Sequence, residues 1–309
     1  MKVKMTRFIR IGLGIIIMLS SLELLAQQDP MFSNYMFNLA TINPASVGHS
    51  DLGSVMSVNR FQWVGIEGAP ETHTLNAEYP LKSINCGAGL TYVLDKVGPE
   101  RSNNIYLDYA YHLKVTENLK LGLGLNAGFR VFSASLRDDI GQSGDDPQFA
   151  SNIKGKFTPN FGVGAFLYDR LFYVGISSPK ILNHKYVHST TSGGEKRHFY
   201  LVSGYVYYIN KSVIFKPSVY FKFVEGAPLS CDINTNFLIN NRIWFGAMFR
   251  WGDAVGFLTQ VQLNDKWRLG YTYDFSFSKM RTVSKGSHEI MLTFEFETKE
   301  SKDKTHWLF

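Results

Sequence analysis

Residues 119–132 read LKLGLGLNAGFRVF, and this stretch decides the fold. Every second residue from Leu119 to Val131 is apolar, whereas the positions between them hold Lys120, Arg130, an asparagine and three glycines. Such an alternation predicts a β-strand with one apolar and one polar face. Strands of soluble proteins average about 5–6 residues, and a tilted strand needs about 9–11 to cross a bilayer. The length of this run therefore favours a membrane strand.

The same alternation recurs along the chain, in residues 105–115, 213–223, 229–239, 266–275 and 289–297. In these runs every charged residue falls on the polar phase. A charged side chain that faces lipid costs roughly 2–4 kcal/mol at the bilayer midplane, so a lipid environment would enforce this segregation. Counting from Ser54, we predict an all-β, transmembrane antiparallel β-barrel of about 14 strands that spans residues 51–297.

Short and long connections alternate between the predicted strands. The short ones carry Asn or Asp and lie at residues 82–85, 117–118, 169–170, 210–211, 240–241 and 264–265. The long ones include residues 133–156 and 179–197. Short periplasmic turns and longer outer loops are typical of outer-membrane barrels, and an even number of strands would place both termini in the periplasm.

The first 26 residues resemble a secretory signal, with a basic start followed by an apolar run. Cleavage after Ala26 would remove four basic residues and one acidic residue, so the formal charge would fall from +6 to +3. The basic balance therefore does not indicate nucleic-acid binding. The mature chain would be an integral outer-membrane protein with the lipid bilayer around it.

Two segments lie outside the predicted barrel strands. Residues 27–50 form a periplasmic or plug segment that is polar, rich in asparagine and without a clear period. Because a barrel of this size has an interior wide enough for water or a plug, this segment is the candidate plug. Residues 298–309 form a charged periplasmic tail, either a docking peptide or a frayed end.

Motifs for catalysis, metals and cofactors are weak. Gly122, Gly124 and Gly128 have the wrong spacing for a dinucleotide loop, and His184 and His188 lie in a loop-like stretch. The acidic pairs at 138–139 and 145–146 match no calcium loop. His112 points toward the predicted lumen near Asp108, but no serine nucleophile accompanies it. We expect no enzymatic activity, no metal and no cofactor, and we expect Cys86 and Cys231 to be free thiols.

The beginning of the mature chain resembles a known family. The blocks that carry the resemblance are Gln28–Asn38, Asn43–Gly48, Arg60–Gly65 and Gly68–Thr72, and the likeness continues through Asp95–Pro99, Pro159–Asn160, Lys216–Ser218 and Gly286–Glu289. Together they resemble the PorP/SprF family of type IX secretion and gliding-motility membrane proteins. The resemblance covers essentially the whole mature chain.

This resemblance implies a non-enzymatic outer-membrane barrel that serves the type IX machinery. Its partners would be type IX secretion components, a secreted surface adhesin, or both. One branch of the family would be needed for the export and surface retention of one large adhesin, and we favour this branch. The other branch would couple the translocon to periplasmic partners.

The candidate plug or partner-contact residues come from these same blocks. Their physical interpretation is separate from the resemblance: the Asn-Pro pair sets a turn, and the tryptophan belongs to an aromatic belt at the membrane interface. An architectural role is favoured over direct partner contact. The candidates are Asp29, Pro30, Phe32, Tyr35, Asn43, Pro44, Arg60, Gln62, Trp63 and Pro70.

Two other functions stay open. Asn43-Pro44-Ala45 also resembles the N-terminal hatch of FadL-type transporters, which suggests a channel for small hydrophobic solutes. Such a channel predicts an apolar pocket behind residues 27–50 and a lateral opening in the wall, and a charged lumen would count against it. An outer-membrane lipase is a more distant alternative.

Overall fold

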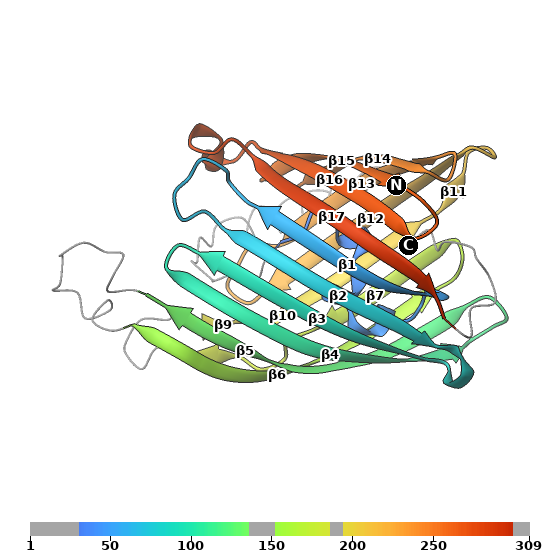
Figure 1. The fold of residues 1–309 in the computed structure, drawn as a ribbon, viewed down its shortest axis with the longest axis horizontal. Coiled ribbons are helices and arrows are strands. Elements are labelled where there is room, and N and C mark those ends of the chain that lie inside the picture. The colour runs from blue at the N-terminus through green and yellow to red at the C-terminus, as the bar shows by residue number, and fades with distance from the viewer. Residues whose placement is uncertain (1–30, 136–151, 186–193, 299–309) are drawn as a thin grey trace, which may run out of the picture.

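The computed structural model describes residues 31–135, 152–185 and 194–298. Within these ranges no helix is long and apolar enough to cross a membrane. The strands form a closed antiparallel barrel of 14 strands (Figure 1), as the alternation predicted. Strands β10 and β11 both pair with β12 and are separated by a single residue, so they count as one interrupted strand.

The barrel strands follow the order of the chain. They are β1 (Leu52–Phe61), β2 (Glu71–Leu81), β3 (Cys86–Val97), β4 (Glu100–Lys114), β5 (Lys120–Ala134), β6 (Ile153–Tyr168), β7 (Phe172–Ser178), β10 (His198–Tyr205), β11 (Tyr207–Tyr208), β12 (Val213–Val224), β13 (Ser230–Ile239), β14 (Ile243–Arg250), β15 (Ala254–Gln262), β16 (Trp267–Ser276) and β17 (Ser287–Glu297). Each pairs with its neighbours in sequence, and β1 pairs with β17 to close the barrel. The short strands β8 (His184–Lys185) and β9 (Gly194–Glu195) pair with each other in a separate two-stranded sheet.

The turns lie at one end of the barrel, which we call the turn end, and the longer connections at the opposite loop end. Asn85, Asn240 and Asn241 have positive φ angles of 53°, 50° and 53°. Asparagine tolerates this left-handed conformation better than most residues, which explains why the turns carry it. The chain enters β1 and leaves β17 at the turn end.

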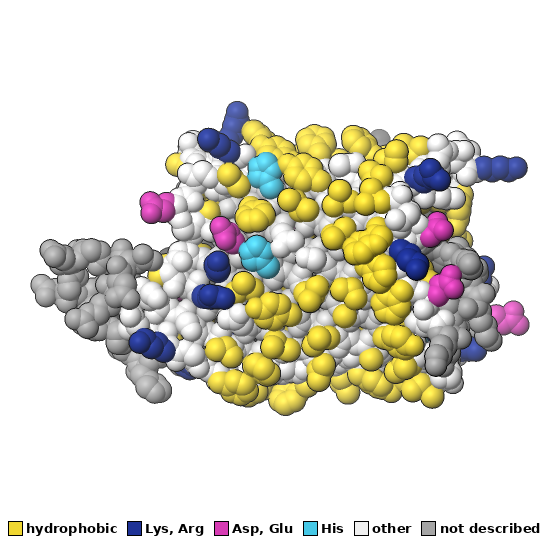
Figure 2. All heavy atoms as spheres, in the orientation of Figure 1, with side chains coloured by type: hydrophobic (Ala, Val, Ile, Leu, Met, Phe, Trp, Pro, Cys, Tyr) yellow, Lys and Arg dark blue, Asp and Glu magenta, His cyan; other side chains and the backbone are white. Residues whose placement is uncertain are grey.

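Side chains alternate between lipid and lumen as expected. Leu107 is 64% exposed on the outer face, whereas Asp108 next to it is 5% exposed inside. Figure 2 shows apolar side chains across the middle of the face in view, with charged side chains mostly toward its two ends. The inward-facing residues instead include many buried charges, among them Arg60, Asp108, Arg130, Lys216, Lys222, Asp232, Arg250, Asp274 and Glu289.

Some predicted boundaries were wrong. Strands β5 and β6 extend into the predicted loop at 133–156, since β5 continues to Ala134 and β6 begins at Ile153. The predicted loop at 179–197 holds the β8–β9 hairpin. Strand β1 ends at Phe61, so Trp63 lies in the following loop with a φ of 52° and does not continue the alternation.

Candidate functional site

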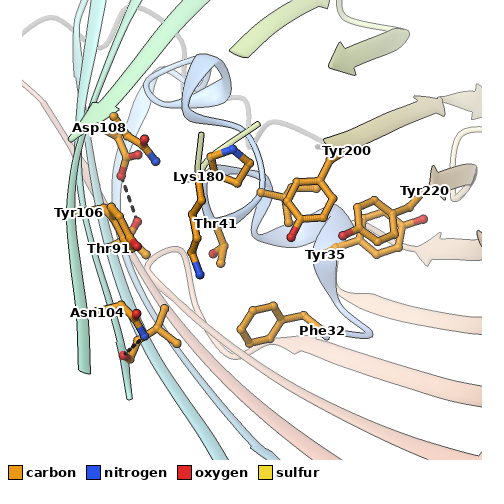
Figure 3. Close-up of a pocket in the computed structure, with 15 residues that line it drawn as sticks. Phe32, Tyr35, Thr41, Thr91, Asn104, Tyr106, Asp108, Lys180, Tyr200 and Tyr220 are labelled. Carbon is orange, nitrogen blue, oxygen red and sulfur yellow. Dashed lines mark hydrogen bonds between the residues drawn. The ribbon is translucent and has the colours of Figure 1, made fainter. Parts of the chain in front are cut away.

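Residues 31–50 lie inside the barrel and contact strands on several sides of the lumen (Figures 1 and 3). They form three short 3-10 turns, η1 (Tyr35–Phe37), η2 (Leu39–Thr41) and η3 (Pro44–Ser46). In the described part of the chain two further 3-10 turns lie outside this segment, η4 (Lys82–Ile84) and η6 (Lys279–Thr282). We call residues 31–50 the N-terminal segment. Whether it acts as a plug stays a prediction.

A buried ionic cluster fixes the start of the N-terminal segment. The Arg60 guanidinium lies 2.8 Å from the Asp274 carboxylate and 3.0 Å from that of Glu289. It also donates to the Ser33 hydroxyl at 2.9 Å. Glu289 accepts the backbone N–H groups of Ser33 and Asn34 at 3.0 and 3.1 Å. The cluster therefore joins the segment to β1, β16 and β17 through charge-assisted hydrogen bonds, which are about twice as strong as neutral ones.

Aromatic contacts hold the next turn against β12 and β14. The Tyr35 ring stacks on Tyr220 of β12 with the ring centroids 4.7 Å apart. Phe37 meets Trp244 of β14 edge to face at 5.3 Å. The buried ammonium of Lys216 lies 4.9 Å from the Phe37 ring and 5.6 Å from the Trp244 ring. Such cation–π contacts gain strength when they are shielded from water.

The Asn-Pro pair caps the third turn. The side-chain oxygen of Asn43 accepts the Ala45 N–H at 3.0 Å, and Pro44 occupies the first position of η3. This agrees with the predicted turn, because asparagine is a favoured N-cap and proline needs no donor at that position. The Asn43 amide also donates to the Ala165 carbonyl of β6 at 3.1 Å. One side chain thus shapes the turn and ties it to the wall.

Inward-facing glycines give this part of the segment its room. A Cβ built on Gly124 would lie 2.2 Å from the Ala45 nitrogen, and one on Gly164 would lie 2.0 Å from the Asn43 side-chain oxygen. Any larger residue would displace the segment. We call this surface the glycine track. Its members on β3, β5, β6 and β7 are Gly87, Gly122, Gly124, Gly164 and Gly175.

The remaining candidate residues do not join one site. Phe32 packs on an apolar cluster around Met56 and Met291. The Gln62 N–H donates to the Pro70 carbonyl at 2.9 Å, so these two residues brace the β1–β2 loop. The Trp63 N–H donates to the Ser287 hydroxyl at 3.1 Å, which also leaves it at the loop end.

Two of the predicted site residues, Asp29 and Pro30, lie outside the described residues. The candidates that lie in the lumen are Phe32, Tyr35, Asn43, Pro44 and Arg60, and they contact different parts of the wall.

Sequence reasoning missed the two carboxylates that hold the segment, Asp274 and Glu289. Both were assigned only to the polar phase of their strands. An available signal was that lumen-facing acidic residues on neighbouring strands need a counter-ion, and Arg60 is the inward-facing basic residue of β1. Their meeting depends on the pairing of β1 with β17 and of β17 with β16.

A cavity lies between the N-terminal segment and the loop end. About 60 Å³ is open to the centres of water molecules, which is room for a few waters. Figure 3 shows Lys180 reaching into it, with Tyr35, Tyr200 and Tyr220 on one side and Asp108 on the other. The Thr91 hydroxyl donates to Asp108 at 3.1 Å. The lining is thus mixed, neither apolar throughout nor charged throughout.

The described residues give no catalytic or metal constellation. His112 contacts the Val47 carbonyl at 2.9 Å and the Tyr168 hydroxyl at 3.0 Å, and no serine lies among these partners. Within the described ranges no three His, Cys, Asp or Glu side chains converge as metal ligands. His184 contacts the Pro159 carbonyl, while His188 and the acidic pairs at 138–139 and 145–146 lie outside those ranges. Both cysteines are free thiols, as predicted.

Comparison with solved structures shows outer-membrane barrels. The chain is similar to the CymD monoaromatic hydrocarbon channel, with a TM-score of 0.52 and 13% identity over 84% of this chain and 92% of that one. It is also similar to a Pseudomonas aeruginosa FadL homologue (TM-score 0.47, 12% identity, 84% and 93% covered) and to Acinetobacter baumannii Omp33 (0.45, 10%, 81% and 100%). At these identities the likeness concerns the fold alone. No curated protein matches the chain.

The family comparison is more specific. Residues 24–294 match the model of the type IX secretion system membrane protein PorP/SprF. The match includes the N-terminal segment, the ionic cluster and the strands up to β17. The chain therefore belongs to the PorP/SprF family of type IX secretion system membrane proteins.

Proposed function

We propose that this barrel is a non-enzymatic outer-membrane component of the type IX secretion system that binds a secreted partner protein, such as a large adhesin. It would be needed for export of that partner and for its retention at the cell surface. The observation that carries this proposal is the family match over residues 24–294. Family membership implies association with the secretion machinery, and the choice of an adhesin as partner is our own step.

The proposed orientation puts the turn end in the periplasm and the loop end outside. The short turns and both ends of the barrel sequence share the turn end, and outer-membrane barrels have short periplasmic turns and longer outer loops. Both termini would then be periplasmic. The loop end would present residues 62–70 and 277–286 to a partner at the surface.

The filled lumen supports binding rather than conduction of an unfolded chain. The N-terminal segment is joined to β16 and β17 through Ser33 and Asn34, and to β6 through Asn43. A polypeptide could pass only after these bonds broke. We therefore propose that the segment acts as a plug, and that the partner is held at the rim.

Deleting the gene and measuring surface display of each type IX cargo tests this proposal. Loss of one adhesin from the surface, with other cargo unaffected, is the expected result. Loss of every cargo would instead support the role of a core component that couples the translocon to periplasmic partners. Unchanged display of all cargo would overturn both roles. Affinity purification of the tagged barrel in mild detergent, with mass spectrometry, would identify the bound partner.

A channel for small hydrophobic solutes is the second candidate. Five aromatic residues line the cavity, Phe32, Tyr35, Tyr106, Tyr200 and Tyr220. Against it stand the buried charges of the lumen, which make a continuous apolar path costly. Uptake of a monoaromatic hydrocarbon by cells with and without the gene separates the two functions, since only a channel predicts a difference.

A further inference from the structure

Two cations face each other on the outer wall at the loop end. Lys96 near the end of β3 is the direct cross-strand partner of Arg101 near the start of β4, and both side chains are exposed. Elsewhere on these strands the outward positions are mainly apolar, as at Leu90, Ile105 and Leu107. Lys96 and Arg101 lie one residue pair before the β3–β4 connection, beyond these apolar positions. This order puts the pair at the level where lipid head groups meet the hydrocarbon.

Like charges placed directly opposite each other on a sheet repel. Glu71 of β2 is the cross-strand partner of Lys96 on its other side. Within the described chain, however, no ion pair or hydrogen bond joins the Lys96 or Arg101 side chain to Glu71 or to any other residue. An external anion between the two cations would relieve their repulsion.

The surface below the pair suits a lipid. Leu90 is 43% exposed and Leu107 is 64% exposed, and they are direct partners on β3 and β4. Between them and the cations, the Tyr92 hydroxyl donates to the Asn103 side chain at 2.9 Å. The wall thus passes from apolar to polar to cationic toward the loop end, which is the order of acyl chain, linkage and phosphate in an anionic lipid.

We propose that Lys96 and Arg101 bind the phosphate of a phosphorylated glycolipid in the outer leaflet. This inference rests on the orientation given in the proposed function, which puts the loop end outside. The lipid would anchor β3 and β4 at a fixed depth beside the rim that we assign to partner binding. A second copy of the chain in a two-fold contact would not fit, because it would bring the same two cations to the patch.

Native mass spectrometry of the purified barrel in detergent tests the site. The probes are diphosphorylated lipid A, its dephosphorylated form and phosphatidylglycerol. An interfacial cation contributes about fivefold to anionic-lipid affinity, so the double variant Lys96→Ala/Arg101→Ala should bind diphosphorylated lipid A about 25-fold more weakly. The control Lys211→Ala/Lys266→Ala removes the same charge from exposed positions at the turn end and should bind like the native protein.

Equal lipid A binding by the native protein and the Lys96→Ala/Arg101→Ala variant would overturn the site. Equal binding of the dephosphorylated form would overturn the phosphate contact. If phosphatidylglycerol bound as tightly and through the same two residues, the assignment to an outer-leaflet glycolipid would be wrong. Cargo display measured in cells with the double variant is a separate readout, so failure of the lipid site and failure of the secretion role are distinguishable.

Discussion

Removing the Arg60 guanidinium should release the N-terminal segment. In Arg60→Leu the carboxylates of Asp274 and Glu289, which are 1% and 0% exposed, would stay buried without the guanidinium that pairs with both. Breaking a buried ion pair by removing one partner costs about 3–5 kcal/mol. Water can solvate the two carboxylates only when the segment leaves. The substitution therefore destabilises the state in which the segment is bound in the lumen. The equilibrium constant for release of the segment should rise roughly 100- to 5,000-fold.

Hydrogen–deuterium exchange in detergent micelles or nanodiscs measures this opening. The backbone N–H groups of Ser33 and Asn34 donate to Glu289 in the closed state, so their exchange should accelerate by that factor in Arg60→Leu. The matched control is Arg268→Leu, which breaks a largely buried ion pair with Glu295 on the wall. If exchange at Ser33 and Asn34 were no faster in Arg60→Leu than in the control, the ionic cluster would not hold the segment.

Three further substitutions test the segment and the wall. Gly124→Ala places a Cβ 2.2 Å from the Ala45 nitrogen, so protease should cut the segment faster than in Gly270→Ala, whose Cβ meets only flexible side chains. Equal cleavage would contradict the glycine track. Asn43→Ala removes the N-cap of η3 and should destabilise this turn by about 1 kcal/mol. The amide of Ala45 should then exchange faster, and unchanged exchange would argue against the cap. Leu107→Arg puts a charge on a 64% exposed outward position. It should lower the free energy of unfolding by roughly 2–4 kcal/mol, measured by urea titration of the barrel in bilayers. A smaller loss than in Leu107→Ala would show that this face does not meet lipid.

Much of the barrel was predictable because lipid imposes a simple local rule. Each outward position must be apolar, so a strand can be recognised from its own residues, as at Leu119–Val131. The turns could also be predicted from their own residues, since Asn85, Asn240 and Asn241 adopt left-handed conformations that few other residues tolerate. Strand ends were less predictable. Beyond the membrane level the rule no longer applies, and β5 and β6 continue past it.

The candidate site was predictable only in its parts. Asn43 and Pro44 define a turn by their own chemistry, and the structure places that turn where their properties require. The Trp63 prediction extended the alternation two residues too far. Trp63 lies in a loop with a positive φ, so the conformation of the loop sets the direction of its side chain, and the alternation of the strand does not apply to it.

The sequence by itself determined the class of fold, the inward and outward faces of the strands with a clear alternation, and the turns. These depend on neighbours a few residues apart. Only the tertiary structure decided which inward residues meet. Arg60 lies 214 residues from Asp274 and 229 from Glu289, and barrel closure brings the three together. The N-terminal segment has no period of its own, so its place depends on the space left by glycines on four different strands.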